Sequence, residues 1–202
     1  MLDEFEKIAW LQKRLQLSDD RVLIGIGDDA AEVRLRSDRA IVTVDTQVQG
    51  VYVHPAWISW RAIGWRAVIA ATSDVWAMGT APTASVVSLT LPGNFPDSDF
   101  FKLVQGVAEA AEQTDAPVVG GNLSAGPVVS VTTTVFGSSR DMVLQRSDAK
   151  AGDGVFVTGT LGGAALGLLL LQRVEKAPTT AHDDVFVARW KCPPVHLSLI
   201  HI

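Results

Sequence analysis

Side chains whose oxygen atoms suit a divalent cation recur at separate places in the first part of the sequence. Asp28 and Asp29 stand in a loop bounded by Gly27. Thr43 and Asp45 would share one face of a strand, because side chains two residues apart point the same way. Such oxygens are ligands for Mg²⁺. Aspartate is also common in turns, so the residue types alone leave a metal site and a turn-capping role open.

Asp74 belongs to the clearest helix pattern of the sequence, over residues 56–78. It shares a stripe with Ala67, Ala71 and Met78, which predicts that its carboxylate faces protein rather than water. Its place near the helix end is unfavourable for a negative charge, and burial of an unpaired carboxylate costs more still. A metal ion would compensate this charge, and so would a distant arginine or a backbone hydrogen bond.

Glycines mark two places where a backbone could approach a ligand closely. Gly120, Gly121 and Asn122 follow a short apolar segment, and peptide N–H groups in such a loop bind phosphate. A tight turn explains the pair of glycines almost as well. The stretch 159–163 is also glycine-rich, but neither stretch matches the phosphate-loop or dinucleotide patterns. Arg146 is placed to reach an anion or to remain a surface residue.

The composition excludes several classes of protein. The chain has 202 residues, is 48% hydrophobic and carries a formal net charge of -5, which disfavours binding to nucleic acid or to an anionic membrane. Its one cysteine, Cys192, cannot form an internal disulfide. No stretch reaches the roughly 20 apolar residues that span a bilayer, and the charged start is unlike a signal peptide. These features predict a soluble cytoplasmic protein that binds neither nucleic acid nor membrane.

The hydrophobic patterns predict an α+β fold, because strands and helices alternate in pairs rather than strictly. The sheet is expected to be mixed or antiparallel, with helices packed on one face. We expect helices over 3–16, 56–78, 97–113 and 162–172, and strands over 31–36, 40–46, 83–91, 117–119, 128–136 and 155–158. We expect a first domain over 1–140, a linker over 141–153, and the incomplete start of a second α+β domain over 154–202.

The order and the residue types of several motifs resemble those of thiamine-monophosphate kinases. The matching stretches are Gly27-Asp28-Asp29-Ala30-Ala31, Thr43-Val44-Asp45-Thr46, Val48-Gln49-Gly50-Val51, Ser73-Asp74-Val75-Trp76-Ala77-Met78-Gly79, Val119-Gly120-Gly121, Arg146-Ser147 and Val157-Thr158-Gly159-Thr160-Leu161-Gly162. The resemblance runs from residue 1 to about residue 194. The wider superfamily includes aminoimidazole ribonucleotide synthetase, selenophosphate synthetase and a hydrogenase-maturation protein.

The resemblance implies transfer of the ATP γ-phosphoryl group to thiamine monophosphate, which gives thiamine diphosphate and ADP. It implies an N-terminal domain of the aminoimidazole ribonucleotide synthetase type, which pairs with its twin in a homodimer. The metal ligands implied for Mg²⁺ are Asp29, Thr43, Asp45, Asp74 and Asn122, with Asp28 alongside. Gly120, Gly121, Asn122 and Arg146 would contact the nucleotide, and Tyr52 would contact the substrate.

Four positions depart from the family pattern. Asn122 stands where Asp is usual, Gln49 where Glu is usual, Tyr52 where a substrate-contacting His is usual, and Val104 where an aromatic residue near the nucleotide base is usual. An amide oxygen can still bind Mg²⁺ but brings no charge, so Asn122 weakens one expected metal site.

The resemblance stops after Pro194, and the tail from about residue 195 is atypical. The family's Asp-Ile-Ser-Asp-Gly-Leu motif is missing, which predicts a chain truncated in its second domain and inactive or poorly active by itself. Two alternatives remain at this stage. One is a sibling enzyme of the superfamily that acts on another small acceptor. The other is a nucleotide-binding or dimerisation fragment without turnover.

Overall fold

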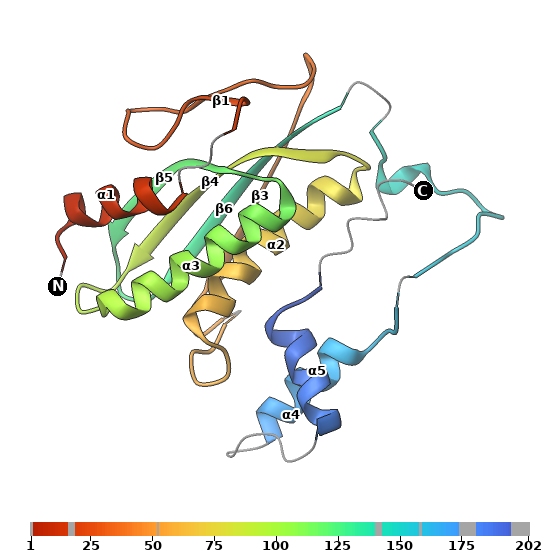
Figure 1. Cartoon of the computed structure of the whole chain (residues 1–202). Coiled ribbons are helices and arrows are strands. Elements are labelled where there is room, and N and C mark those ends of the chain that lie inside the picture. The colour runs from red at the N-terminus through yellow and green to blue at the C-terminus, as the bar shows by residue number, and fades with distance from the viewer. Residues whose placement is uncertain are drawn as a thin grey trace. The chain divides into compact units, whose positions relative to one another are not determined.

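The computed structural model describes residues 2–15, 19–51, 53–139, 143–157, 159–173 and 181–194 (Figure 1). The chain forms two compact units, one up to Val143 and one over Leu144–Val195. The domain limits predicted from the sequence stay a prediction.

A mixed four-stranded sheet forms the centre of the first unit. Its strands are β3 (Ala40–Val48), β6 (Ser130–Ser138), β4 (Ala81–Leu91) and β5 (Val118–Ala125), in that spatial order. β6 is antiparallel to both β3 and β4, whereas β5 is parallel to β4. Two short strands, β1 (Val22–Ile24) and β2 (Glu32–Val33), form a separate antiparallel pair.

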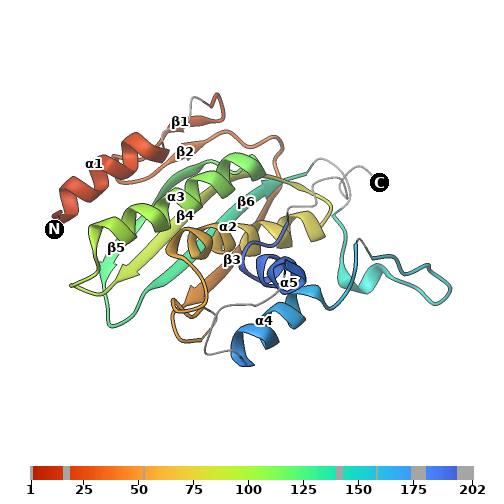
Figure 2. The same ribbon diagram turned by 60° about the horizontal axis from the view of Figure 1, so that its bottom comes forward.

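The two faces of the sheet have different surroundings. α2 (Trp60–Ala77) and α3 (Asp97–Thr114) lie side by side across one face, as Figures 1 and 2 both show. Val135 of β6 points to this side and is buried with Ala71 and Val75 of α2. The opposite face carries Val42 and Val44, which are 57% and 61% exposed. This sheet with helices on one face confirms the predicted α+β class.

Two glycines allow α2 and α3 to approach each other closely. A Cβ atom at Gly64 would lie 2.0 Å from the carbonyl oxygen of Leu103, and one at Gly106 would lie 1.8 Å from that of Arg61. Real Cβ atoms do not come so close, so only glycine fits at these two positions. The close crossing of α2 and α3 therefore depends on the absence of a side chain at these two glycines. α1 (Glu4–Leu15) adds Trp10, which packs against Phe101 of α3 with ring centroids 4.5 Å apart.

The second unit contains the 3₁₀ helix η1 (Arg146–Asp148), α4 (Gly163–Arg173) and α5 (Ala181–Lys191). α4 and α5 pack closely at Gly167, where a Cβ atom would lie 2.1 Å from the carbonyl oxygen of Phe186. Val155 and Phe156 are more than nine-tenths exposed, at 93% and 92%. None of the described helices is both long and apolar enough to cross a bilayer.

Several predicted elements needed correction. α2 begins at Trp60 rather than residue 56, because Ser59 caps it by accepting a hydrogen bond from the N–H of Ala62. The strand predicted over 155–158 is wrong for 155–157, where the structure has no strand, and Thr158 lies outside the described residues. Helix α5 was not predicted. β5 extends through the two glycines at which it was expected to end.

The α2–α3 crossing gives a test of the fold. Gly106→Ala should lower the free energy of unfolding by about 1–3 kcal/mol, because the added methyl group must push the two helices apart. Urea denaturation measures this loss. Gly93→Ala is the matched control, since nothing lies within 4 Å of its Cβ position and its φ is not positive. Equal stability of both variants would contradict the close approach.

Candidate functional site

The contact that brings two predicted ligands together joins β3 to α2. The hydroxyl of Thr43 donates a hydrogen bond of 2.9 Å to the Oδ2 atom of Asp74. The two residues are 31 positions apart in the sequence, and the packing of α2 on the sheet makes them neighbours. Asp74 is exposed, so the prediction that it faces protein was wrong. Its carboxylate accepts the hydrogen bond of Thr43 at the surface, where α2 meets β3.

Asp45 points to the same side of β3 as Thr43, because side chains two residues apart in a strand point to the same face. It is partly buried and lies opposite Thr133 of β6. Its Oδ1 atom accepts a hydrogen bond of 2.6 Å from the backbone N–H of Thr46. One carboxylate oxygen is therefore engaged locally, and the other is available to a ligand.

Asp28 and Asp29 lie in an exposed loop between β1 and β2. Gly27 precedes them with a φ of +124°, a backbone conformation that favours glycine. The Oδ1 atom of Asp28 accepts a hydrogen bond of 2.8 Å from the N–H of Asp29, which fixes the turn. Within the described ranges, no three Asp, Glu, His or Cys side chains gather closely enough to form a ready metal site.

Gly120, Gly121 and Asn122 were expected in a loop but lie within β5, paired with Val86, Val87 and Ser88 of β4. A Cβ atom at Gly121 would lie 1.9 Å from the carbonyl oxygen of Val87, so this position requires glycine for strand pairing. Asn122 is exposed. The sheet register places Asn122 in one row with Ser88, Thr132 and Thr46, on the face away from α2. Asp45 and Asn122 therefore lie on opposite faces.

The remaining predicted residues are placed as follows. Arg146 is exposed in the second unit, where it begins η1. Tyr52 lies outside the described residues. Val104 is 1% exposed within the core, so it is a packing residue and cannot contact a nucleotide base. The side-chain oxygen of Gln49 accepts a hydrogen bond of 3.1 Å from the N–H of Val129, which closes the end of the β3–β6 pair.

The donor set of β3 and α2 suits Mg²⁺ in its chemistry. Thr43, Asp45 and Asp74 offer only oxygen atoms, and the 2.9 Å contact shows that groups from a strand and a helix reach each other there. Mg²⁺ is usually held by one or two carboxylates, with water molecules and substrate phosphates as the remaining ligands. The residues present therefore fit a Mg²⁺–phosphate complex better than a bare ion.

Residues 27–139 match the family described as AIR synthase related protein, N-terminal domain. This span includes the acidic loop, β3, α2 and β5, and it exceeds half of the 202 residues. The chain belongs to this family.

Relatives with assigned names agree with this placement. The thiamine-monophosphate kinase of Bacillus subtilis (strain 168) is 34% identical over 98% of this chain, which spans 62% of the relative's length. The solved thiamine-monophosphate kinase of Stenotrophomonas maltophilia K279a is 32% identical with a TM-score of 0.82, over 98% of this chain and 64% of that one. AaThiL complexed with AMPPCP and TMP is 31% identical with a TM-score of 0.77, over 98% and 61%. The chain thus spans about three-fifths of the length of these relatives.

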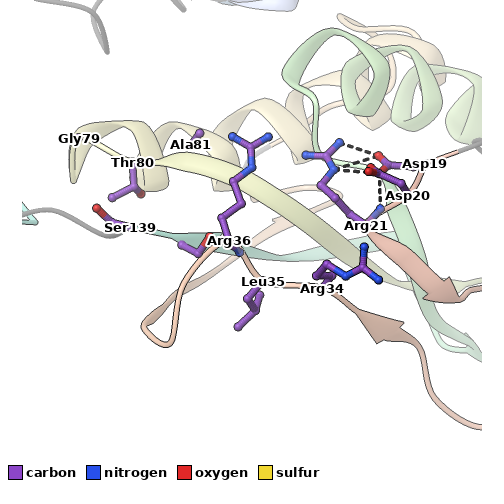
Figure 3. A pocket seen from close by; sticks show the side chains of 11 residues that line it. Asp19, Asp20, Arg21, Arg34, Leu35, Arg36, Gly79, Thr80, Ala81 and Ser139 are labelled. Carbon is purple, nitrogen blue, oxygen red and sulfur yellow. Dashed lines mark hydrogen bonds and ion pairs between the residues drawn. The ribbon is translucent and has the colours of Figure 1, made fainter.

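The first unit also has a cavity of about 1120 Å³ that was not predicted from the sequence (Figure 3). Arg21, Arg34 and Arg36 line it, together with Asp19. Arg21 forms hydrogen bonds with the carboxylates of Asp19 and Asp115 and with the backbone carbonyl of Asp115, which caps the C-terminus of α3. Cations at a helix C-terminus are favourable, so we assign Arg21 a structural role. The only sequence signal was the alternation of Arg34 and Arg36.

The Asp19–Arg21 pair makes stability depend on pH. Side-chain hydrogen bonds from Arg21 hold the pKa of the Asp19 carboxyl below its usual value. Both side chains are largely buried, at 13% and 14% exposure. A carboxyl with a lowered pKa in the folded state stabilises the fold above its unfolded pKa of about 3.9, and this contribution is lost as the pH falls through the folded pKa.

Arg21→Gln should therefore lower the free energy of unfolding by about 1.5–3 kcal/mol at neutral pH. The difference in the free energy of unfolding between this variant and the natural chain should become smaller as the pH falls below about 4. Urea denaturation across this pH range measures both effects. Arg34→Gln removes the same charge from the same cavity without breaking a side-chain hydrogen bond that the structure records. It should change the free energy of unfolding little, both at neutral pH and at acidic pH. A difference that stayed constant with pH would contradict the pairing.

Proposed function

We propose that this chain forms the metal- and nucleotide-binding part of a kinase that transfers the γ-phosphoryl group of ATP to thiamine monophosphate. The products would be thiamine diphosphate and ADP. The observation that carries this proposal is the likeness to AaThiL complexed with AMPPCP and TMP, at 31% identity over 98% of the chain. The name of these relatives, thiamine-monophosphate kinase, supports the same substrate. We place the reaction in the cytoplasm, as the sequence predicts.

Mg²⁺ would be held by Asp29, Thr43, Asp45 and Asp74, with Asp28 alongside. Asn122 lies on the other face of the sheet and would bind a separate Mg²⁺ ion. When bound, the metal would neutralise the phosphate charge that develops in phosphoryl transfer, a reaction that needs mainly positioning and electrostatic stabilisation. The contact between Thr43 and Asp74 supports the part of this set contributed by β3 and α2. Asp45 has a carboxylate oxygen that the backbone of Thr46 does not engage.

The nucleotide would lie along Gly120, Gly121 and Asn122, with Arg146 on its phosphates. Gly120 and Gly121 have no side chain beyond hydrogen, so a ligand could approach the exposed end of β5 closely. Tyr52 would contact the thiamine monophosphate. The neutral amide of Asn122 favours a second candidate, a nucleotide-binding module without turnover.

Calorimetry of ATP binding with and without Mg²⁺ tests the site. ATP binding should require Mg²⁺ and should be lost in the double variant Asp45→Ala, Asp74→Ala, because the carboxylates that hold the metal are removed. Asp38→Ala removes an exposed carboxylate of another loop and should bind like the natural chain.

The outcomes separate the two candidates. Mg²⁺-dependent binding with formation of thiamine diphosphate from thiamine monophosphate would support the kinase. Binding without product would support the module. Failure of a folded chain to bind ATP, or equal binding by the double variant, would reject the proposed site.

We further propose that the chain pairs with a second copy through the sheet face that lacks helices. Val42 and Val44 of the edge strand β3 lie on this face and are 57% and 61% exposed. Burial of such side chains favours association by about 25 cal/mol per Å² of apolar surface, and an unpaired edge strand is a site of further pairing.

Val44→Lys should convert the dimer into a monomer, because a charge would be buried at the interface. Light scattering at micromolar concentration measures the mass. Val155→Lys introduces the same charge at a 93% exposed valine of the second unit and should leave the dimer intact. A monomeric natural chain would contradict the pairing.

A further inference from the structure

Two buried polar atoms on the helix-facing side of the sheet have no hydrogen-bond partner among the described residues. They are the side-chain oxygen Oε1 of Gln47 and the hydroxyl oxygen of Thr133. Gln47 is 7% exposed and Thr133 is completely buried. Buried polar groups in folded proteins are nearly always paired, so each exception calls for an explanation such as a bound water molecule or ion.

The register places both groups beside Asp45. Thr133 lies directly opposite Asp45 in the β3–β6 pair. Gln47 follows Asp45 by two residues and therefore points to the same face. In the other direction along β3, Thr43 contacts Asp74. A continuous polar strip thus runs beneath α2 through an interface that is otherwise lined by residues such as Val135 and Val75.

The chemistry of the unpaired atoms matches the outer side of a hydrated cation. Water molecules bound to a metal ion present their hydrogen atoms outward, so they need acceptors. The amide oxygen of Gln47 and the hydroxyl oxygen of Thr133 are both acceptors. Mg²⁺ in proteins usually keeps several of its water molecules. Leucine and valine would fill the same space without leaving an acceptor unpaired.

We propose that Gln47 and Thr133 are positioning residues that bind a water molecule of the cation held at Asp45. The two hydrogen atoms of this water are donated to the two acceptors, and its oxygen binds the metal, which the free carboxylate oxygen of Asp45 would hold from the other side. Groups in this outer shell commonly change metal affinity by about 10–100-fold. The inference rests on the proposed metal site.

The test measures the thermal unfolding midpoint during titration with Mg²⁺ at a fixed, saturating concentration of ATP. Gln47→Leu and Thr133→Val should be at least as stable as the natural chain without Mg²⁺, because an unpaired polar atom is removed. Each variant should then need a Mg²⁺ concentration about 10-fold higher than the natural chain to reach half of the maximal rise in the unfolding midpoint. Gln47→Glu retains an oxygen acceptor and should need no more Mg²⁺ than the natural chain.

Thr132→Val is the matched control. Its hydroxyl contacts Thr46 on the opposite face of the same strand, so its loss should leave the Mg²⁺ requirement unchanged. This inference would be overturned if Gln47→Leu and Thr133→Val both kept the Mg²⁺ requirement of the natural chain while Asp45→Ala lost the Mg²⁺-dependent stabilisation. That result would still support the metal site. If the natural chain showed no Mg²⁺-dependent stabilisation, the metal site and this inference would fail together.

Discussion

The packing of α2 against β6 is the constraint on which the candidate site depends. Val75 and Ala71 are buried against Val135, and Gly137 leaves the space that Val75 needs, since a Cβ there would lie 2.6 Å from its side chain. Asp74 precedes Val75, so the burial of the valine fixes where the carboxylate emerges. The 2.9 Å contact with Thr43 follows from that apolar packing, because an exposed hydrogen bond contributes too little to position a helix. Apolar burial here determines the position of a polar group.

The sheet register divides the proposed ligands between two faces. Asp45, Thr133, Val87 and Gly121 form one row of neighbours, and Thr46, Thr132, Ser88 and Asn122 form the next. Adjacent rows point in opposite directions. The first row faces the helices, and the second lies on the face through which we propose that a second copy binds. A single ion cannot touch Asp45 and Asn122 through the sheet. Asn122 can therefore take part in metal binding in two ways. Either a nucleotide reaches around the end of a strand from one face to the other, or a separate ion binds on the open face.

The sequence predicted the elements whose signals are local. α1 and α3 were predicted to within one residue at each end, because their apolar spacing and flanking turns lie within the segment itself. Errors arose where a distant partner decides the structure. The glycines at 120 and 121 suggested a turn, yet β4 pairs with them, and no local pattern reveals that Gly121 must approach Val87. The orientation of Asp74 was inferred from a helical stripe, but its exposure depends on where the sheet ends. The unpaired state of Gln47 and Thr133 likewise depends on pairing across the sheet.

The scattered carboxylates have a consequence for the order of binding. Mg²⁺ requires close to six oxygen ligands in a regular arrangement, while no three acidic or histidine side chains gather in the described part of the chain. A bare ion would therefore obtain few protein ligands and would keep most of its water. An ion that already carries phosphate oxygens needs only one or two carboxylates, which Asp45 and Asp74 can provide from neighbouring elements. Because coupling between two ligands is reciprocal, a metal that strengthens nucleotide binding must itself bind more tightly when the nucleotide is present. If the proposed site is correct, this geometry would favour uptake of the metal together with the nucleotide.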